Sequence, residues 1–264
     1  MLIVNLTPDA LADVLLLGGH AAAVENFLLT NDEDAPVYPE ALVHVEVARM
    51  LRERLNFSSI ELEATTERLV CAASGRSPGD PDFPDIGRDG KFDIVCWNGF
   101  VPQVFVEVKD QISGADDGIV ADMLRMQSML QIVHRWGPRA PHTKVSRYAA
   151  VLYFVGKNTD QYKKKRHLAS QFIPFANRSV NTTVRNIRRV VDSSRFDLLV
   201  KKTRVHDSAK DAPPNLELVG TAEEETVSGS EQLTYCVVCV LRERNRETTV
   251  TDETSAVGCG ELVR

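Results

Sequence analysis

The sequence predicts an α/β fold in which a mixed central β-sheet is flanked by helices. Two apolar, β-rich runs meet at Asn98-Gly99, a dipeptide typical of a hairpin turn because both residues tolerate a positive φ. Apolar residues at helical spacing follow from Ile119 to Val133, and Tyr148 to Val155 is a nearly continuous apolar run typical of a buried strand. A hairpin, a crossover helix and a buried strand together indicate a sheet with helices on its faces.

Helices are expected in the residues that precede the hairpin. The apolar opening predicts one helix over residues 8–17 and a second over 20–29. Pro39, at a first helical turn, introduces a helix over Glu40 to Leu55 with apolar residues on one side.

The remaining elements follow from composition and spacing. Ile60 to Cys71 predicts a strand, and the Gly-, Pro- and Asp-rich residues 73–90 predict a loop. Downstream, residues 180–191 predict a helix, 195–200 a strand and 232–241 a last strand.

The length of 264 residues fits one large α/β domain with additions at each end. We expect an N-terminal helical appendage over residues 1–38 and a core over 39–210. Residues 211–264 are expected to form a linker, the last strand and a polar tail.

Composition indicates a soluble, cytoplasmic protein that does not enter a membrane. The apolar run from Leu11 to Val24 is interrupted by polar residues and glycines and has no basic leader. Five cysteines, an odd number with scattered spacing, fit a reducing compartment. Cys236 and Cys239 have a C-x-x-C spacing, but on a strand they would point to opposite faces, which argues against a zinc site.

Two acidic residues and a lysine stand in the hairpin. Asp93 lies in the first strand, while Glu107 and Lys109 alternate along the second and therefore share one face. Burying a carboxylate in such apolar runs is costly unless it is paired or binds a cation. Two carboxylates that hold Mg²⁺ could activate water for phosphodiester hydrolysis, with Lys109 orienting that water.

This pattern resembles the PD-(D/E)xK nuclease superfamily. Asp93, thirteen intervening residues and then Glu107-Val108-Lys109 carry the resemblance, which covers roughly residues 39 to 155. Phe92 stands where the superfamily often has proline. The resemblance implies a restriction-endonuclease-like core and a Mg²⁺-dependent endodeoxyribonuclease, with Mn²⁺ able to substitute, acting in restriction, defence or repair.

The resemblance also suggests further ligands. An acidic residue of the first helix often completes the metal shell in this family, and Glu46 is the better candidate than Glu40, while the carbonyl of Val108 could add a ligand. A surface pair between Glu46 and Arg49 is the alternative. Gln111 would share the face of Lys109 if the strand continues, and could contact substrate or water.

Charge is distributed unevenly along the chain. Residues 135–210 hold 18 Lys or Arg against four Asp, a net charge of +14, whereas the whole chain has a net charge of −6. A basic segment of this kind favours a polyanion partner. The residues expected to contact nucleic acid are Lys163, Lys164, Lys165, Arg166, Arg185, Arg188 and Arg189.

Three interpretations therefore stand side by side. The first is a DNA nuclease, in which a homodimer would place two sites on two strands. The second is a catalytically silent nucleic-acid-binding or assembly module in which Asp93, Glu107 and Lys109 form a structural ion-pair cluster. The third is a nuclease for RNA, or one switched on by a small ligand, since a basic surface binds phosphate whatever the sugar.

Overall fold

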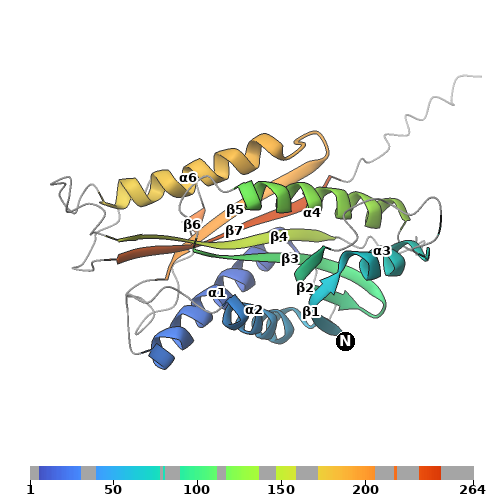
Figure 1. Ribbon diagram of the computed structural model, residues 1–264, viewed down its shortest axis with the longest axis horizontal. Helices are drawn as coiled ribbons and strands as arrows, with labels where there is room; N and C mark the ends of the chain where they lie inside the picture. Colours follow the sequence, from blue (N-terminus) through green and yellow to red (C-terminus); the bar gives the residue numbers. More distant parts are fainter. Residues whose placement is uncertain are drawn as a thin grey trace, which may run out of the picture.

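The computed structural model of the chain describes residues 6–30, 40–77, 80, 90–111, 117–136, 147–158, 172–205, 217–218 and 232–244. They form a mixed α/β fold with one seven-stranded sheet in the order β1-β2-β3-β4-β7-β5-β6 (Figure 1). The strands are β1 (Ser59–Thr65), β2 (Lys91–Asn98), β3 (Val101–Gln111), β4 (Tyr148–Asn158), β5 (Phe196–Arg204), β6 (Glu217–Leu218) and β7 (Gln232–Glu243). The helices are α1 (Pro8–Thr30), α2 (Glu40–Leu55), α3 (Thr66–Ser74), α4 (Asp117–Trp136) and α6 (Phe172–Val190).

The sheet separates two hydrophobic layers. Helices α1 and α2 cover one face, where Leu15 and Val47 pack against alternate strand residues such as Val106. Helices α3, α4 and α6 cover the other face (Figure 1). There, residues such as Met126 and Ile187 pack with the strand residues that point to this side. Both faces of β4 are buried, as expected for a continuous apolar run.

Strands β3 and β4 pair in parallel, and helix α4 connects them. The prediction of a crossover helix between two neighbouring strands is therefore confirmed. The helix over Glu40 to Leu55 also has the predicted bounds. Together these elements confirm a mixed sheet flanked by helices, which is the coarser part of the predicted fold class.

The two helices expected at the N-terminus are one helix, so that prediction is wrong. Gly18 and Gly19 lie inside α1, where the absence of a side chain lets α2 and β7 approach the helix closely. A Cβ on Gly18 would lie 2.7 Å from the Cα of Val47 in α2, and one on Gly19 would lie 2.6 Å from the Sγ of Cys236 in β7. These glycines therefore serve helix packing rather than a chain break.

The strand predicted over Ile60 to Cys71 ends early. Strand β1 stops at Thr65, whose hydroxyl accepts a hydrogen bond from the backbone N–H of Arg68 and caps α3. The apolar residues Leu69 and Val70, which the prediction assigned to the strand, are buried on that helix. A threonine N-cap accordingly explains the error.

The hairpin turn is one residue later than predicted. Asn98 still pairs with Val101, so Gly99 and Phe100 form the turn. Gly99 has a φ of +62°, a conformation that favours glycine. The prediction of a hairpin between the two runs is nevertheless confirmed.

Segments near both ends of the described residues belong to the packed fold. Helix α1 contributes buried residues to the layer formed with α2, and β7 lies between β4 and β5 within the sheet. Residues from both ends of the chain therefore complete the core. Helix α1 is also long and apolar enough to cross a membrane, but 56% of its most apolar window is buried within this fold.

Candidate metal centre

Strands β2 and β3 bring two carboxylates together where their pairing ends. The last backbone pair before Asp93 is Ile94 with Val106, so continuation of this register places Asp93 opposite Glu107. At this point the side chain of Asp93 replaces a backbone partner: its Oδ2 accepts a hydrogen bond of 2.7 Å from the backbone N–H of Val108. The carboxylate is thereby fixed in position.

Glu107 is deeply buried, with 1% of its surface exposed. Burial and the neighbouring carboxylate of Asp93 raise the pKa of Glu107 to about 9, although Arg125 acts in the opposite direction. A carboxylate in this setting favours either a proton or an additional cation. The structure thus places the buried carboxylate of Glu107 beside the partly buried carboxylate of Asp93.

Lys109 lies on the same side of β3 as Glu107, as strand alternation predicts. Its Nζ is 3.1 Å from Oδ2 of Asp122 in α4, and its side chain is 33% exposed. Burial opposes the charged form, but Asp122, Glu107 and Asp93 outweigh it and raise the pKa of Lys109. The lysine is therefore a cation at neutral pH.

Two residues of α4 complete this network, and the sequence reasoning did not identify them. Nη2 of Arg125 donates to Oε1 of Glu107 and lies 3.1 Å from Oδ1 of Asp122. Asp122 thus links Lys109 to Arg125. The helical spacing of Asp122 and Arg125, three residues apart, was the available signal, but only the packing of α4 on β3 shows which face they occupy.

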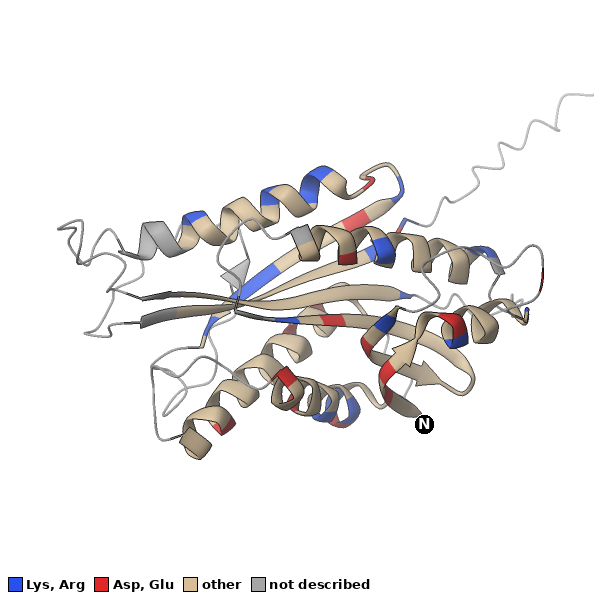
Figure 2. Cartoon of the chain, in the orientation of Figure 1, with Lys and Arg blue, Asp and Glu red and all other residues tan. Residues whose placement is uncertain are grey.

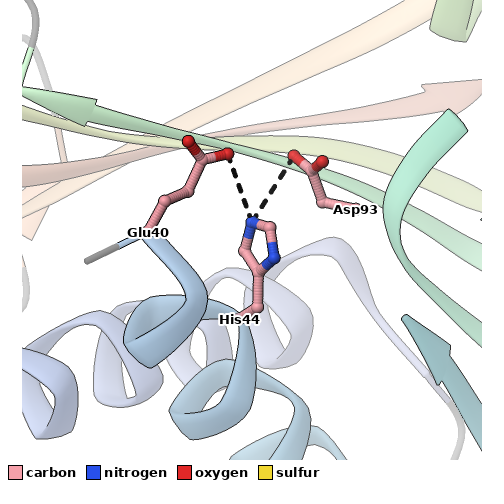
Figure 3. Close-up of side chains that lie close together, drawn as sticks. All are labelled: Glu40, His44 and Asp93. Carbon is pink, nitrogen blue, oxygen red and sulfur yellow. Dashed lines mark ion pairs between the residues drawn. The ribbon is translucent and has the colours of Figure 1, made fainter. Parts of the chain in front are cut away.

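A second group meets Asp93 from the opposite layer (Figure 3). The Nε2 atom of His44 in α2 lies 3.4 Å from Oε1 of Glu40 and 3.9 Å from Oδ2 of Asp93. One potential ligand atom from each of these three residues lies within 4.8 Å of the others, close enough for one metal ion to contact all three. Asp93 is therefore shared by the groups on the two sides of the sheet.

The structure groups Glu40 with Asp93 and leaves Glu46 elsewhere. Glu46 forms an ion pair of 2.5 Å with Arg49 on α2. Glu40 is therefore the glutamate of α2 that lies near Asp93, and the structure contains the pair between Glu46 and Arg49 that was the alternative. Glu40 and His44 are one helical turn apart, a spacing that could have indicated both.

Gln111 is described only in its backbone, and residues 163–166 are not described. The register of β3 against β4 shifts between Lys109 and Gln111, which removes the simple alternation on which the prediction for Gln111 depended. The side chain of Gln111 and the run Lys163, Lys164, Lys165 and Arg166 lie outside the described residues. The backbone of Val108 is described, and its N–H is bound to Asp93.

The arginines of α6 share an exposed face. Arg185, Arg188 and Arg189 are all exposed, while Val184 and Ile187 of the same helix are buried. Figure 2 shows basic residues along this helix, which lies beside α4 on the face of the sheet that carries Lys109. Gln127 of α4 fixes the end of α6 by donating to the carbonyl of Val190 and accepting from the N–H of Asp192.

Other basic residues of the same segment have structural partners. Lys201 pairs with Asp9 and Asp13 of α1, and Lys202 donates to Asn177. The net charge of the segment therefore overstates the basic surface. Cys236 and Cys239 are buried in opposite layers, as predicted.

The chain matches no protein-family model, and comparison with curated proteins and with solved structures likewise gave no match. The resemblance to PD-(D/E)xK nucleases stays a prediction.

Proposed function

We propose that this protein is a metal-dependent nuclease that hydrolyses phosphodiester bonds of DNA through a restriction-endonuclease-like site. The observation that carries the proposal is the buried carboxylate of Glu107 beside the partly buried carboxylate of Asp93, with the cationic Lys109 on the same face as Glu107. This is the combination of oxygen ligands and nearby positive charge that phosphodiester hydrolysis requires.

The charges of the described cluster support a divalent cation. Four carboxylates, two basic side chains and one histidine meet in it. When all four carboxylates are ionised, as carboxylate ligands of a metal must be, the basic side chains balance only two of the four negative charges. The excess of two negative charges matches one divalent cation. The members of this cluster are Glu40, His44, Asp93, Glu107, Lys109, Asp122 and Arg125.

The residues fit Mg²⁺ or Mn²⁺, since Asp93 and Glu107 offer oxygen atoms and can be supplemented by Glu40. When bound, such an ion would polarise the phosphate and lower the pKa of a coordinated water. Asp93, held by the N–H of Val108, fixes one side of that site. Lys109, kept charged and positioned by Asp122, orients water or neutralises charge that develops on the phosphate.

The basic face of α6 supports nucleic acid as substrate. Arg185, Arg188 and Arg189 could contact successive phosphates of a backbone, and α6 packs on α4, the helix that carries Asp122. These contacts do not read bases or sugars. DNA is the proposed substrate, and RNA is the alternative that the test must include.

The test is cleavage of supercoiled plasmid, linear duplex, single-stranded DNA and RNA with Mg²⁺, Mn²⁺ or EDTA. We expect metal-dependent cleavage by the unaltered protein and none by Asp93→Asn, which preserves the shape of the side chain. Glu46→Gln is the matched control because its partner is Arg49, outside the cluster. No cleavage under any condition would exclude the proposal.

A second candidate, a silent nucleic-acid-binding module, is favoured by one observation. Arg125 already contacts both Glu107 and Asp122, and Asp122 in turn contacts Lys109, so these side chains form an ion-pair network without a metal. In that case Asp93→Asn should leave DNA affinity unchanged, and no metal should yield cleavage.

A further inference from the structure

The imidazole of His44 is buried and lacks a hydrogen bond at one nitrogen. Its side chain is 10% exposed, and among the described residues Nε2 has no hydrogen-bond partner. An unpaired polar atom in the interior loses its hydrogen bonds to water without gaining one in the protein, which destabilises the fold. Such a group therefore requires a physical explanation.

The carboxylates around Nε2 of His44 supply a physical explanation. Figure 3 shows the imidazole projecting from α2 with Nε2 directed between the carboxylates of Glu40 and Asp93. The contact distances of 3.4 and 3.9 Å leave this nitrogen close to both carboxylates without hydrogen bonding to either. Ligands about 2.1 Å from one metal lie roughly 3–4 Å apart, so only small side-chain movements are needed to enclose an ion.

We propose that His44 is a nitrogen ligand which, together with Glu40 and Asp93, makes this a site for a transition-metal ion of the Mn²⁺ class. The inference deepens the proposed function and rests on it for the presence of a metal at Asp93. Its new content is the imidazole ligand from α2 and the metal preference that follows from it.

The preference follows from ligand chemistry. Mg²⁺ favours oxygen ligands and retains several waters, whereas imidazole nitrogen suits first-row transition metals. Mn²⁺ accepts both carboxylate oxygen and imidazole nitrogen. A site with one nitrogen and two carboxylates should thus bind Mn²⁺ more tightly than Mg²⁺.

The position of Asp93 connects this ion to the hairpin carboxylates. Asp93 is beside both His44 and Glu107, which lie on opposite sides of the sheet. Ligands from α2 on one side and from β3 on the other would therefore close on the same aspartate. The ion would hold together two elements that are far apart in the sequence.

The test is Mn²⁺ binding to the full chain, followed by electron paramagnetic resonance with electron spin-echo detection of nitrogen coupled to the ion. The unaltered protein should bind Mn²⁺ and show imidazole ¹⁴N modulation. His44→Gln and His44→Ala should lose the modulation and weaken Mn²⁺ binding on the order of 10–100-fold. His134→Gln, which alters an exposed histidine beside Glu243, should keep both properties.

Two further measurements sharpen the result. Glu40→Gln should weaken Mn²⁺ binding yet keep the ¹⁴N modulation, since the nitrogen ligand is intact. Competition with Mg²⁺ should show that His44→Gln lowers the preference for Mn²⁺ over Mg²⁺ by about tenfold or more. Circular dichroism and thermal unfolding of each variant identify any loss that comes from misfolding.

Absence of Mn²⁺ binding, or bound Mn²⁺ without ¹⁴N modulation, would overturn the inference, as would modulation that persists in a folded His44 variant. These outcomes are separable from failure of the proposed function. Nitrogen-coordinated Mn²⁺ in a protein that cleaves no nucleic acid would exclude the nuclease and leave the His44 site intact. Cleavage supported by a bound metal that shows no nitrogen coupling would keep the nuclease proposal and exclude His44 as a ligand.

Discussion

The carboxylate of Asp93 accepts a hydrogen bond of 2.7 Å from the backbone N–H of Val108, across the point where backbone pairing of β2 with β3 ends. One residue thus has two roles. It satisfies a backbone donor of the strand that carries Glu107 and Lys109, and it presents its carboxylate to both layers of the fold.

The two roles can be separated by substitution. Asp93→Asn retains an oxygen that can accept from Val108, whereas Asp93→Ala leaves that N–H without its acceptor. We expect Asp93→Ala to lower the free energy of unfolding by about 1–3 kcal/mol and Asp93→Asn to change it less. Both should abolish cleavage. Urea denaturation measures the first effect, and equal stability of the two variants would contradict the structural role.

Removing the charge of Glu107 should alter the pH dependence of stability. Because burial and Asp93 raise its pKa to about 9 in the folded, metal-free protein, the folded state retains a proton that the unfolded state releases. The stabilisation is present below the unfolded pKa and is lost as pH rises from about 4.5 to about 9. Glu107→Gln should remove this decline, which thermal unfolding in EDTA between pH 5 and 8.5 would reveal.

Asp122 should control the charge of Lys109. Burial disfavours the ammonium, and Asp122 is the first of the carboxylates that offset burial and raise the pKa of Lys109. In Asp122→Asn we expect the alkaline limit of cleavage to move to lower pH, and in Lys109→Met that limit should vanish along with most activity. Rates measured against pH in single turnovers test this. An unchanged profile in Asp122→Asn would show that Asp122 does not position the lysine.

The arginine face of α6 should supply salt-dependent affinity. Replacing Arg185, Arg188 and Arg189 by alanine should weaken DNA binding and reduce the slope of log affinity against log salt by about 2–3 if each contacts one phosphate. Arg49→Ala is the control, because Arg49 is an exposed arginine on α2 and pairs with Glu46. An equal loss of DNA affinity in the α6 variant and in Arg49→Ala would indicate a general effect of charge.

Helix α1 should determine the position of α2. Since a Cβ on Gly18 would lie 2.7 Å from the Cα of Val47, Gly18→Ala must displace the helix that carries Glu40 and His44. We expect a loss of about 1–3 kcal/mol in stability and weaker Mn²⁺ binding. Glu25→Ala, on the exposed side of α1, is the comparison. Calorimetry and metal titration of both variants provide the measurements.

Local sequence signals predicted much of the fold. The spacing of apolar residues predicted α2, α4 and β4, and alternation placed Glu107 and Lys109 on one face. Where tertiary packing decided the outcome, prediction failed. Two successive glycines indicate a break between helices, because a sequence does not show that Val47 and Cys236 approach Gly18 and Gly19.

The candidate site was predictable only in part for the same reason. Asp93, Glu107 and Lys109 lie in one hairpin, so short-range rules bring them together. Glu40, His44, Asp122 and Arg125 reach them from helices on opposite faces of the sheet. Their contribution depends on the rotation of α2 and α4 about their axes, which is set by packing of the buried residues.

The place of β7 in the sheet has a consequence for synthesis. This strand pairs with β4 along residues 148–158 and with β5 along residues 196–204, so it joins two parts of the sheet made earlier. During translation, β4 and β5 each present an unpaired edge until residues 232–243 leave the ribosome. A chain truncated before residue 232 would therefore leave the backbone edges of two strands unpaired, and unpaired edges are templates for aggregation. Completion of the last strand is thus the step that converts an aggregation-prone intermediate into the finished sheet.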